Sequence, residues 1–117
     1  LLIALKKYRG LVLPSLEDAN GIVVQEAMAL GLPCICLDWG GPQLLVQNGK
    51  TGYLVAPKSI DFITTQMASH MDRLSQDANL AEQFSIEARK IAESWRWSQV
   101  SLDWVCLYPE GKSQWGR

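Results

Sequence analysis

The sequence predicts an α/β domain in which a parallel sheet of about three strands is flanked by helices. Three short apolar runs, at residues 11–13, 34–37 and 53–55, have the composition of buried strands. Helix-forming segments separate these runs, and apolar residues recur at helical spacing beyond residue 59. This order is typical of a partial Rossmann-like sheet followed by a helical C-terminal half.

The first elements can be placed from their end signals. We expect residues 1–8 to be the last turns of a helix, which Gly10 ends before the first strand. The next helix should run from about residue 20 to residue 30. Asn20 is its predicted N-cap, and Gly31 is its predicted C-terminal stop.

The later elements are marked by turns and by periodicity. The Gly-Gly-Pro turn at residues 40–42 should lead into a short helix near residues 43–47. Two longer helices are indicated by two sets of apolar residues at helical spacing, namely Ile60, Ile63, Met67 and Met71, then Leu80, Phe84, Ala88 and Ile91. A further helix is expected at residues 98–107.

Composition excludes several classes of function. The 117 residues suffice for one domain, and they are 48% hydrophobic and 20% charged with a net charge of −1. This balance has no basic surplus for nucleic acid, and no apolar run reaches the roughly 20 residues of a membrane span. The first residues do not resemble a signal peptide. The odd set of cysteines, Cys34, Cys36 and Cys106, indicates buried thiols in a reducing cytoplasm.

The segment at residues 14–31 is the most informative about function. Glu26 is the only charge between Gly21 and Leu30, so its carboxylate should face water, a partner or a ligand. The helix start near Gly21 offers backbone N–H groups to a phosphate, and Gly21 lets a ligand approach the backbone. Glu26 lies about 6 Å further along the helix, where a carboxylate could hold the vicinal hydroxyls of a ribose.

Two structural explanations of these acids stay open. Glu17 or Asp18 could only cap the helix, because both lie in the loop before it. Glu26 could form an ion pair with a Lys or Arg elsewhere in the chain. If these acids instead bind a ligand, Asp18 would accept hydrogen bonds from a second sugar beyond the phosphates.

The same segment resembles the donor-site signature of retaining glycosyltransferases of the family 4 type, which have the GT-B fold. The resemblance rests on ten positions, Pro14, Ser15, Asp18, Gly21, Glu26, Ala27, Met28, Ala29, Gly31 and Pro33. It implies the second half of a GT-B C-terminal domain. Residues 1–93 would be a nucleotide-sugar-binding domain without its first strands, and residues 94–117 a C-terminal helix and tail.

The resemblance also implies roles for individual residues. Glu26 would hold the ribose of a UDP- or GDP-sugar, and Asp18 would be the catalytic-site acid that faces the transferred sugar. Asn20, Gly21 and Ile22, with Glu17 beside them, would approach the sugar and diphosphate. Such enzymes need no bound metal or other cofactor, and the only histidine, His70, is expected on a solvated helix face.

Some positions depart from the family pattern. Asp18 stands where the family normally has Glu, and Asn20 replaces the usual aromatic residue. Leu44 occupies the register of a Glu that usually follows the Gly-Gly turn. The basic pair that grips the diphosphate in the family has no equivalent in this chain. These departures indicate a subgroup and leave the donor sugar undefined.

The predicted function is therefore the donor-binding portion of a hexosyltransferase-type enzyme, inactive without an N-terminal acceptor domain. The acceptor would be a saccharide or a lipid-linked saccharide, and nucleic acid is not an expected partner. A cytoplasmic location is expected, with peripheral association at the inner face of the membrane as an alternative. A truncated, non-catalytic binding module is the competing function. A dinucleotide-dependent oxidoreductase is disfavoured because no G-x-G-x-x-G turn follows a strand.

Overall fold

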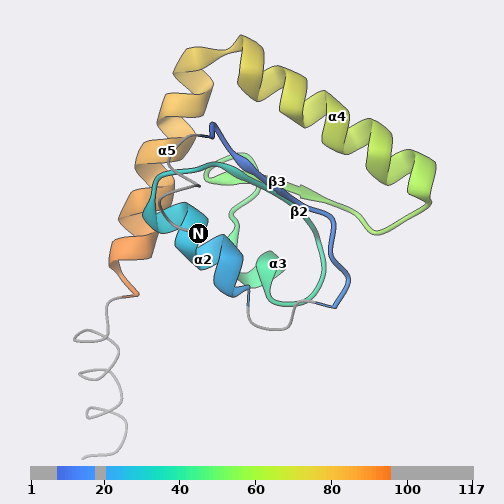
Figure 1. The fold of residues 1–117 in the computed structure, drawn as a ribbon, viewed down its shortest axis with the longest axis horizontal. Helices are drawn as coiled ribbons and strands as arrows, with labels where there is room; N and C mark the ends of the chain where they lie inside the picture. Colours follow the sequence, from blue (N-terminus) through green and yellow to red (C-terminus); the bar gives the residue numbers. More distant parts are fainter. Residues whose placement is uncertain (1–7, 18–20, 96–117) are drawn as a thin grey trace, which may run out of the picture.

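The computed structural model describes residues 8–17 and 21–95, and they form one parallel sheet covered by helices (Figure 1). The strands are β1 (Leu11–Leu13), β2 (Cys34–Leu37) and β3 (Gly52–Val55), adjacent in that order. The helices are α2 (Ile22–Ala29), α3 (Pro42–Leu45), α4 (Ile60–Gln76) and α5 (Ala78–Glu93). The predicted three-stranded parallel sheet and helical C-terminal half are confirmed.

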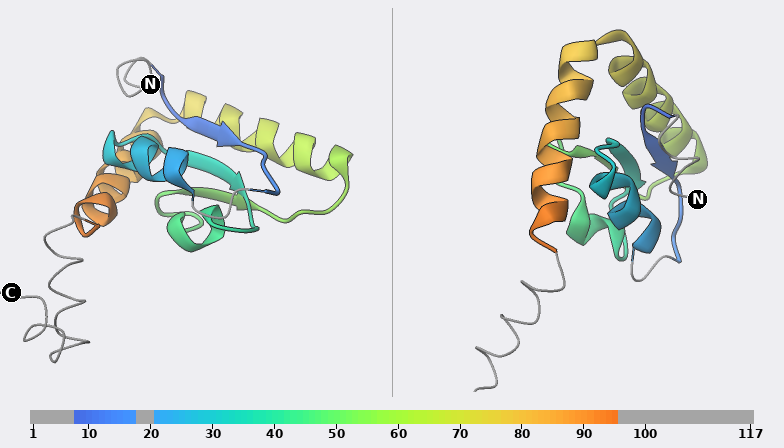
Figure 2. Two further views of the ribbon diagram at one scale, coloured as in Figure 1. Left: turned by 60° about the horizontal axis from the view of Figure 1, so that its bottom comes forward. Right: turned by 60° about the vertical axis from the view of Figure 1, so that its left-hand side comes forward.

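Strand β2 divides the core into two layers because its side chains alternate between the faces of the sheet. Cys34 and Cys36 pack with the buried residues of α2, whereas Ile35 and Leu37 pack with those of α4. Helix α5 lies beside both α2 and α4 (Figure 2). It contributes Ala88 to the layer on the α2 side and Phe84 to the layer on the α4 side. All four residues of β2 are buried, as its continuous apolar run predicts.

The two cysteines of β2 are free thiols inside this core. Burial raises the pKa of the Cys34 thiol, and the neighbouring Cys36 raises it further. Cys34 is therefore a packing residue rather than a reactive one. The prediction of buried thiols is confirmed for this pair, and Cys106 lies outside the described residues.

Several predicted boundaries need correction. Helix α2 begins at Ile22 with Gly21 as its N-cap, whereas the sequence indicated Asn20, which lies outside the described residues. Helix α3 spans Pro42–Leu45 rather than residues 43–47, because the backbone at Val46 is already extended. Strand β3 starts one residue earlier than predicted, at Gly52.

Gly31 ends α2 and brings α5 against it. Its φ of 75° is left-handed, and the Gly31 N–H donates to the Met28 carbonyl while the Leu32 N–H donates to that of Ala27. This is the Schellman arrangement of a helix C-terminus. A Cβ on Gly31 would lie 2.5 Å from Arg89 Nε. The Arg89 guanidinium also donates to the Leu30 carbonyl at 3.4 Å, which places a cation at the negative end of α2.

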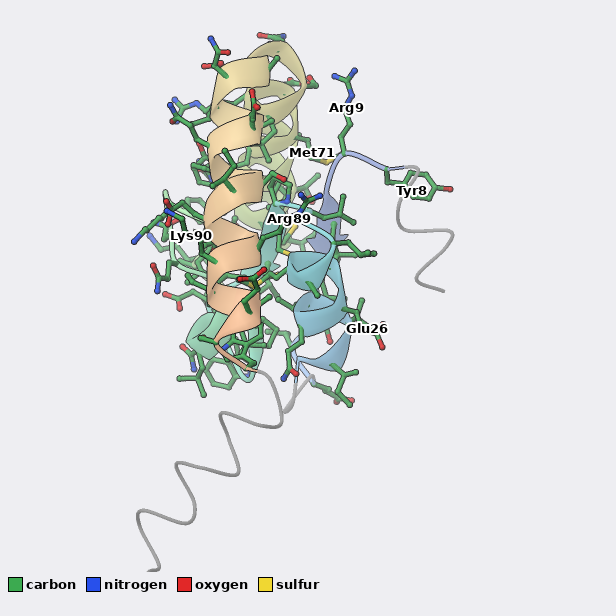
Figure 3. The ribbon with its side chains drawn as sticks, turned by 90° about the vertical axis from the view of Figure 1, so that its left-hand side faces the viewer. Tyr8, Arg9, Glu26, Met71, Arg89 and Lys90 are labelled. Atoms are coloured by element: carbon green, nitrogen blue, oxygen red, sulfur yellow. The ribbon has the colours of Figure 1, made fainter. Side chains whose placement is uncertain are left out.

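Strand β1 is an open edge of the sheet within the described part of the chain. It pairs only with β2, and all three of its residues are half-buried. An apolar groove of about 150 Å³ runs beside it, lined in part by Val12, Met71 and Leu74. Met71 lies beside this open edge (Figure 3) and is 49% exposed, although its periodicity indicated the core.

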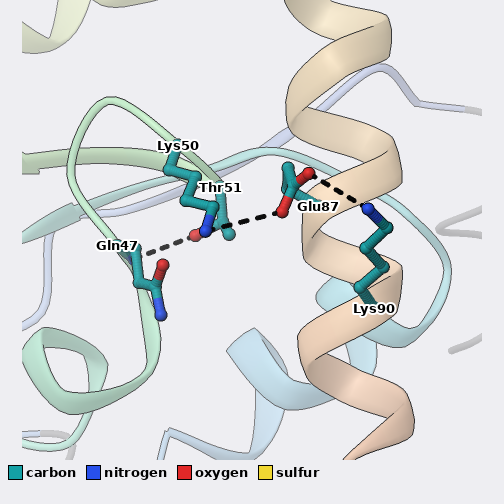
Figure 4. Close-up of polar contacts among 5 residues, drawn as sticks. All are labelled: Gln47, Lys50, Thr51, Glu87 and Lys90. Carbon is teal, nitrogen blue, oxygen red and sulfur yellow. Dashed lines mark hydrogen bonds and ion pairs between the residues drawn. The ribbon is translucent and has the colours of Figure 1, made fainter.

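The loop before β3 is held by one buried hydroxyl. Thr51 is fully buried, and its Oγ1 accepts from the Gln47 N–H at 2.9 Å (Figure 4). Next to it, Lys50 forms an ion pair with Glu87 of α5, and Glu87 also pairs with Lys90. Because the side chains of both lysines are largely exposed, the ion pairs contribute less to stability than the buried hydroxyl does.

Some sequence predictions fall outside the described residues. They include the helix expected at residues 1–8, apart from its last residue, and the helix at 98–107. The division of the chain at residue 93 also stays a prediction. In the described ranges, no helix has the length and apolar character needed to cross a membrane.

The closure of α2 by Gly31 gives a testable stability difference. Gly31→Ala should destabilise the protein more than Gly49→Ala, which has a φ of 79° but open space around it. Both variants carry the left-handed strain of about 1–3 kcal/mol, and Gly31→Ala adds roughly 1–3 kcal/mol of overpacking. Urea unfolding of both variants measures the difference. Equal losses of stability in the two variants would show that the packing of α5 against α2 does not require a glycine at position 31.

Candidate functional site

The start of α2 lies at the carboxyl edge of the parallel sheet. β1 runs toward this edge, and the chain then turns back to begin α2 next to α3 (Figure 1). Ligands of open parallel α/β sheets bind at such edges. The first amide groups of an α-helix have no acceptor within the helix and carry the positive end of its dipole. Ile22, the first residue of α2, is 57% exposed, so this helix start is accessible.

Gly21 allows α2 and α3 to meet closely. Its φ is 63°, and a Cβ at this position would lie 2.6 Å from Cδ1 of Leu45. The same Cβ would lie 3.6 Å from the backbone of Gly41 and of Pro42, at the start of α3. The predicted reason for Gly21 was ligand approach. The structure adds a packing reason, because Leu45 occupies the space of the missing side chain.

The carboxylate of Glu26 has an unusual environment for a charged group. Its Oε2 atom is enclosed, and no residue in the described part of the chain donates a hydrogen bond to it, although Glu26 as a whole is only half-buried. The ion pairs of Glu87 with Lys50 and with Lys90 do not involve Glu26, so they give no support to the alternative of a structural pair for Glu26. The Glu26 side chain points away from α5 (Figure 3). Enclosing a carboxylate oxygen without a partner costs stability.

The remaining predicted site residues are only partly visible. Glu17 is exposed in the loop before α2, where its N–H donates to the Ser15 hydroxyl at 3.3 Å. Asp18 and Asn20 lie outside the described residues, so their predicted roles stay predictions. Trp39 lies just beyond β2 and is 53% exposed.

The two long helices begin differently from α2. Ser59 caps α4 by accepting from the Phe62 N–H, and Asp77 caps α5 by accepting from the Leu80 N–H. The N-cap of α2 is Gly21, which has no side chain to do the same, and the first turn of α2 has no acidic residue. An anionic ligand at α2 would therefore meet no competing carboxylate from that turn.

A larger hollow elsewhere does not have the features of this site. It measures about 710 Å³ and lies at the turn between α4 and α5, with Asp72, Arg73 and Asp77 among its lining residues. Its walls are polar and open, whereas ligand sites are mostly apolar and enclosed. None of the predicted site residues lines it. We therefore assign the candidate site to the start of α2.

His70 is half-buried rather than fully solvated as the sequence had indicated. Its ring stacks on Tyr53 with the centroids 4.0 Å apart, and Tyr53 also meets the edge of the Phe84 ring. Burial lowers the pKa of His70, and the nearby Arg73 lowers it further. The described residues contain no group of three potential metal ligands, and His70 serves packing.

Comparison with known proteins identifies the family. A family model described as glycosyl transferases group 1 matches residues 2–91. The chain belongs to the group 1 glycosyltransferases. This confirms the predicted resemblance, and the matched residues include every strand and the whole of α2, α3 and α4.

Relatives of this glycosyltransferase chain are much longer than it is. It is 31% identical over 100 residues to the D-inositol 3-phosphate glycosyltransferase of Streptomyces bingchenggensis, covering 86% of this chain and 21% of that protein. It is 30% identical over 95 residues to the sucrose synthase of Melioribacter roseus, covering 80% of this chain and 12% of that protein. The chain thus spans about an eighth to a fifth of these relatives.

Solved glycosyltransferases share the fold of this chain. The pneumococcal O-GlcNAc transferase, solved in complex with UDP and GlcNAc, superposes with a TM-score of 0.77 at 26% identity. The match covers 91% of this chain and 22% of that one. The sucrose-phosphate synthase of Thermosynechococcus elongatus gives a TM-score of 0.72 at 27% identity, covering 90% and 26% of the two chains. These neighbours confirm the predicted GT-B class.

The stacked His70 makes the stability of this chain dependent on pH. Its pKa is lowered from 6.5 in the folded state, so the unfolded chain binds the proton more readily. The unfolding free energy should be greatest above pH 6.5 and should decrease as the pH falls toward the folded pKa. Urea unfolding between pH 5 and 8, with His70→Phe as control, measures this. A decrease of equal size in the control would exclude His70 as the cause.

Proposed function

We propose that this chain is the donor-binding portion of a retaining glycosyltransferase that uses a UDP- or GDP-linked sugar. The diphosphate of the donor binds at the start of α2, on the amide groups that follow Gly21. Glu26 accepts two hydrogen bonds from the vicinal hydroxyls of the ribose. The nucleotide-sugar specificity of the site follows from this pair of contacts.

The observation that carries the proposal is the enclosed, unpartnered Oε2 atom of Glu26. It belongs to the turn of α2 that follows the helix start, about 6 Å along the axis from Ile22. That spacing suits a phosphate and the pentose joined to it. The pneumococcal relative, whose structure was determined with UDP and GlcNAc, adds support from the family.

The loop before α2 supplies the remaining groups in this proposal. Asp18 faces the transferred sugar near its anomeric carbon. There its carboxylate stabilises the positive charge that develops on the sugar as the diphosphate departs. Glu17, Asn20, Gly21 and Ile22 surround the sugar and the diphosphate. No metal or other cofactor takes part, and the departing charge is balanced by the helix start.

Glycosyl transfer also needs an acceptor held against the anomeric carbon. We propose that a second domain of the complete gene product supplies the acceptor site for a saccharide or a lipid-linked saccharide. This chain alone is then inactive and binds nucleotides weakly. The protein works in the cytoplasm, and the inner face of the membrane is the alternative location. The alternative, a non-catalytic binding module, is favoured if the complete gene product binds a donor but never turns it over.

Replacing Glu26 should separate donor binding from stability. In the complete gene product, Glu26→Ala should weaken binding of the UDP- or GDP-sugar by about 1–3 kcal/mol, the cost of losing a charge-assisted partner. The same change should leave the unfolding free energy unchanged or raise it, because it removes an unpartnered carboxylate oxygen. Calorimetry and urea unfolding measure the two effects.

Glu82→Ala is the matched control, because Glu82 is an exposed acid on α5. It should change neither the donor affinity nor the stability. A structural ion pair at Glu26 would give the opposite pattern, with lost stability and unchanged donor affinity. That result would remove Glu26 from the proposed site.

Asp18→Ala tests the catalytic assignment. An acid that acts mainly in the transition state should lower kcat far more than it raises the dissociation constant of the donor. Steady-state kinetics and calorimetry on the complete gene product measure both quantities, with Asp18→Glu as the family-like control. Equal losses in turnover and affinity would assign Asp18 to ground-state binding only.

A further inference from the structure

Leu45 connects the core of the protein with the start of α2. It is half-buried, it packs against the core cluster formed by α2, β2 and α5, and its Cδ1 covers Gly21. Its neighbours in α3 differ. Leu44 is 83% exposed, and Pro42 is fully buried at the beginning of the helix. Leu45 is therefore the side chain of α3 that reaches the N-cap of α2.

This contact restricts the backbone where α2 begins. Gly21 at φ 63° has access to many other conformations, because it has no Cβ. As a glycine, it also has no side chain of its own with which to cap α2. Leu45 and the backbone of Gly41 and Pro42 occupy the space into which the Gly21 segment would otherwise move. Packing against Leu45 therefore contributes to fixing the start of α2, whereas Ser59 and Asp77 cap α4 and α5 with their side chains.

We propose that Leu45 is a positioning residue for the nucleotide-sugar site. It holds Gly21 in the left-handed conformation, so that the amide groups of Ile22 and Val23 point at the donor diphosphate before it binds. The proposal rests on the proposed function, because it assigns that diphosphate to α2. Leu45 acts through Gly21 and does not itself contact the donor.

The test compares two leucines of similar burial in the complete gene product. Leu45→Ala removes the contact with Gly21, whereas Leu80→Ala removes a half-buried leucine of the α4 layer. Both variants should lose stability through the cavities they leave. Only Leu45→Ala should also weaken the binding of UDP, by about tenfold or more, because misplacing a binding group by about 1 Å is costly. Calorimetry measures the affinity for UDP under conditions in which each variant is folded. Urea unfolding measures the stability of each variant.

Conservative variants keep the test decisive if Leu45→Ala does not fold. Leu45→Met conserves volume and should restore UDP affinity, and Leu45→Val should give an intermediate loss. If Leu45→Ala and Leu80→Ala bind UDP equally well, the positioning role is wrong and the proposed function stands. If the unmodified protein binds neither UDP nor GDP, the proposed function fails and the role of Leu45 fails with it.

Discussion

Helix α2 is held between two glycines, and the arrangement of the candidate site depends on that constraint. Gly21 and Gly31 have φ angles of 63° and 75°, and in both cases another side chain occupies the space of the missing Cβ. Leu45 of α3 covers the first glycine, and Arg89 of α5 covers the second. The helix is therefore fixed at both ends by close packing, with its start at the carboxyl edge of the sheet.

This fixation explains how a carboxylate can stay enclosed without a partner. Val24, Ala27 and Met28 bury the inner face of α2 and set its rotation about the axis. Glu26 is consequently held at the border of the core, where the burial of its neighbours offers Oε2 no donor. Such a local cost is common where binding rather than stability has determined the residue. The start of α2 and the carboxylate thus belong to one proposed site.

The sequence predicted the strands more accurately than the helix ends. Residues 11–13 and 34–37 were placed correctly, because a continuous apolar run with Gly or Pro next to it leaves few alternatives. The N-cap of α2 was misplaced at Asn20, since a glycine held by packing has no local sequence signal. The stack of His70 on Tyr53 was missed for a similar reason, because the two residues belong to different elements. The contact of Leu45 with Gly21 had no pattern that could have revealed it.

The direct test of the central claim is residue-resolved hydrogen exchange of the complete gene product with and without UDP. If the diphosphate rests on the start of α2, the amides of Ile22 and Val23 should exchange more slowly in the presence of UDP. The amides at the start of α5, where Asp77 already caps the helix, should be unaffected. Slower exchange confined to other elements, with Ile22 and Val23 unchanged by bound UDP, would contradict the account.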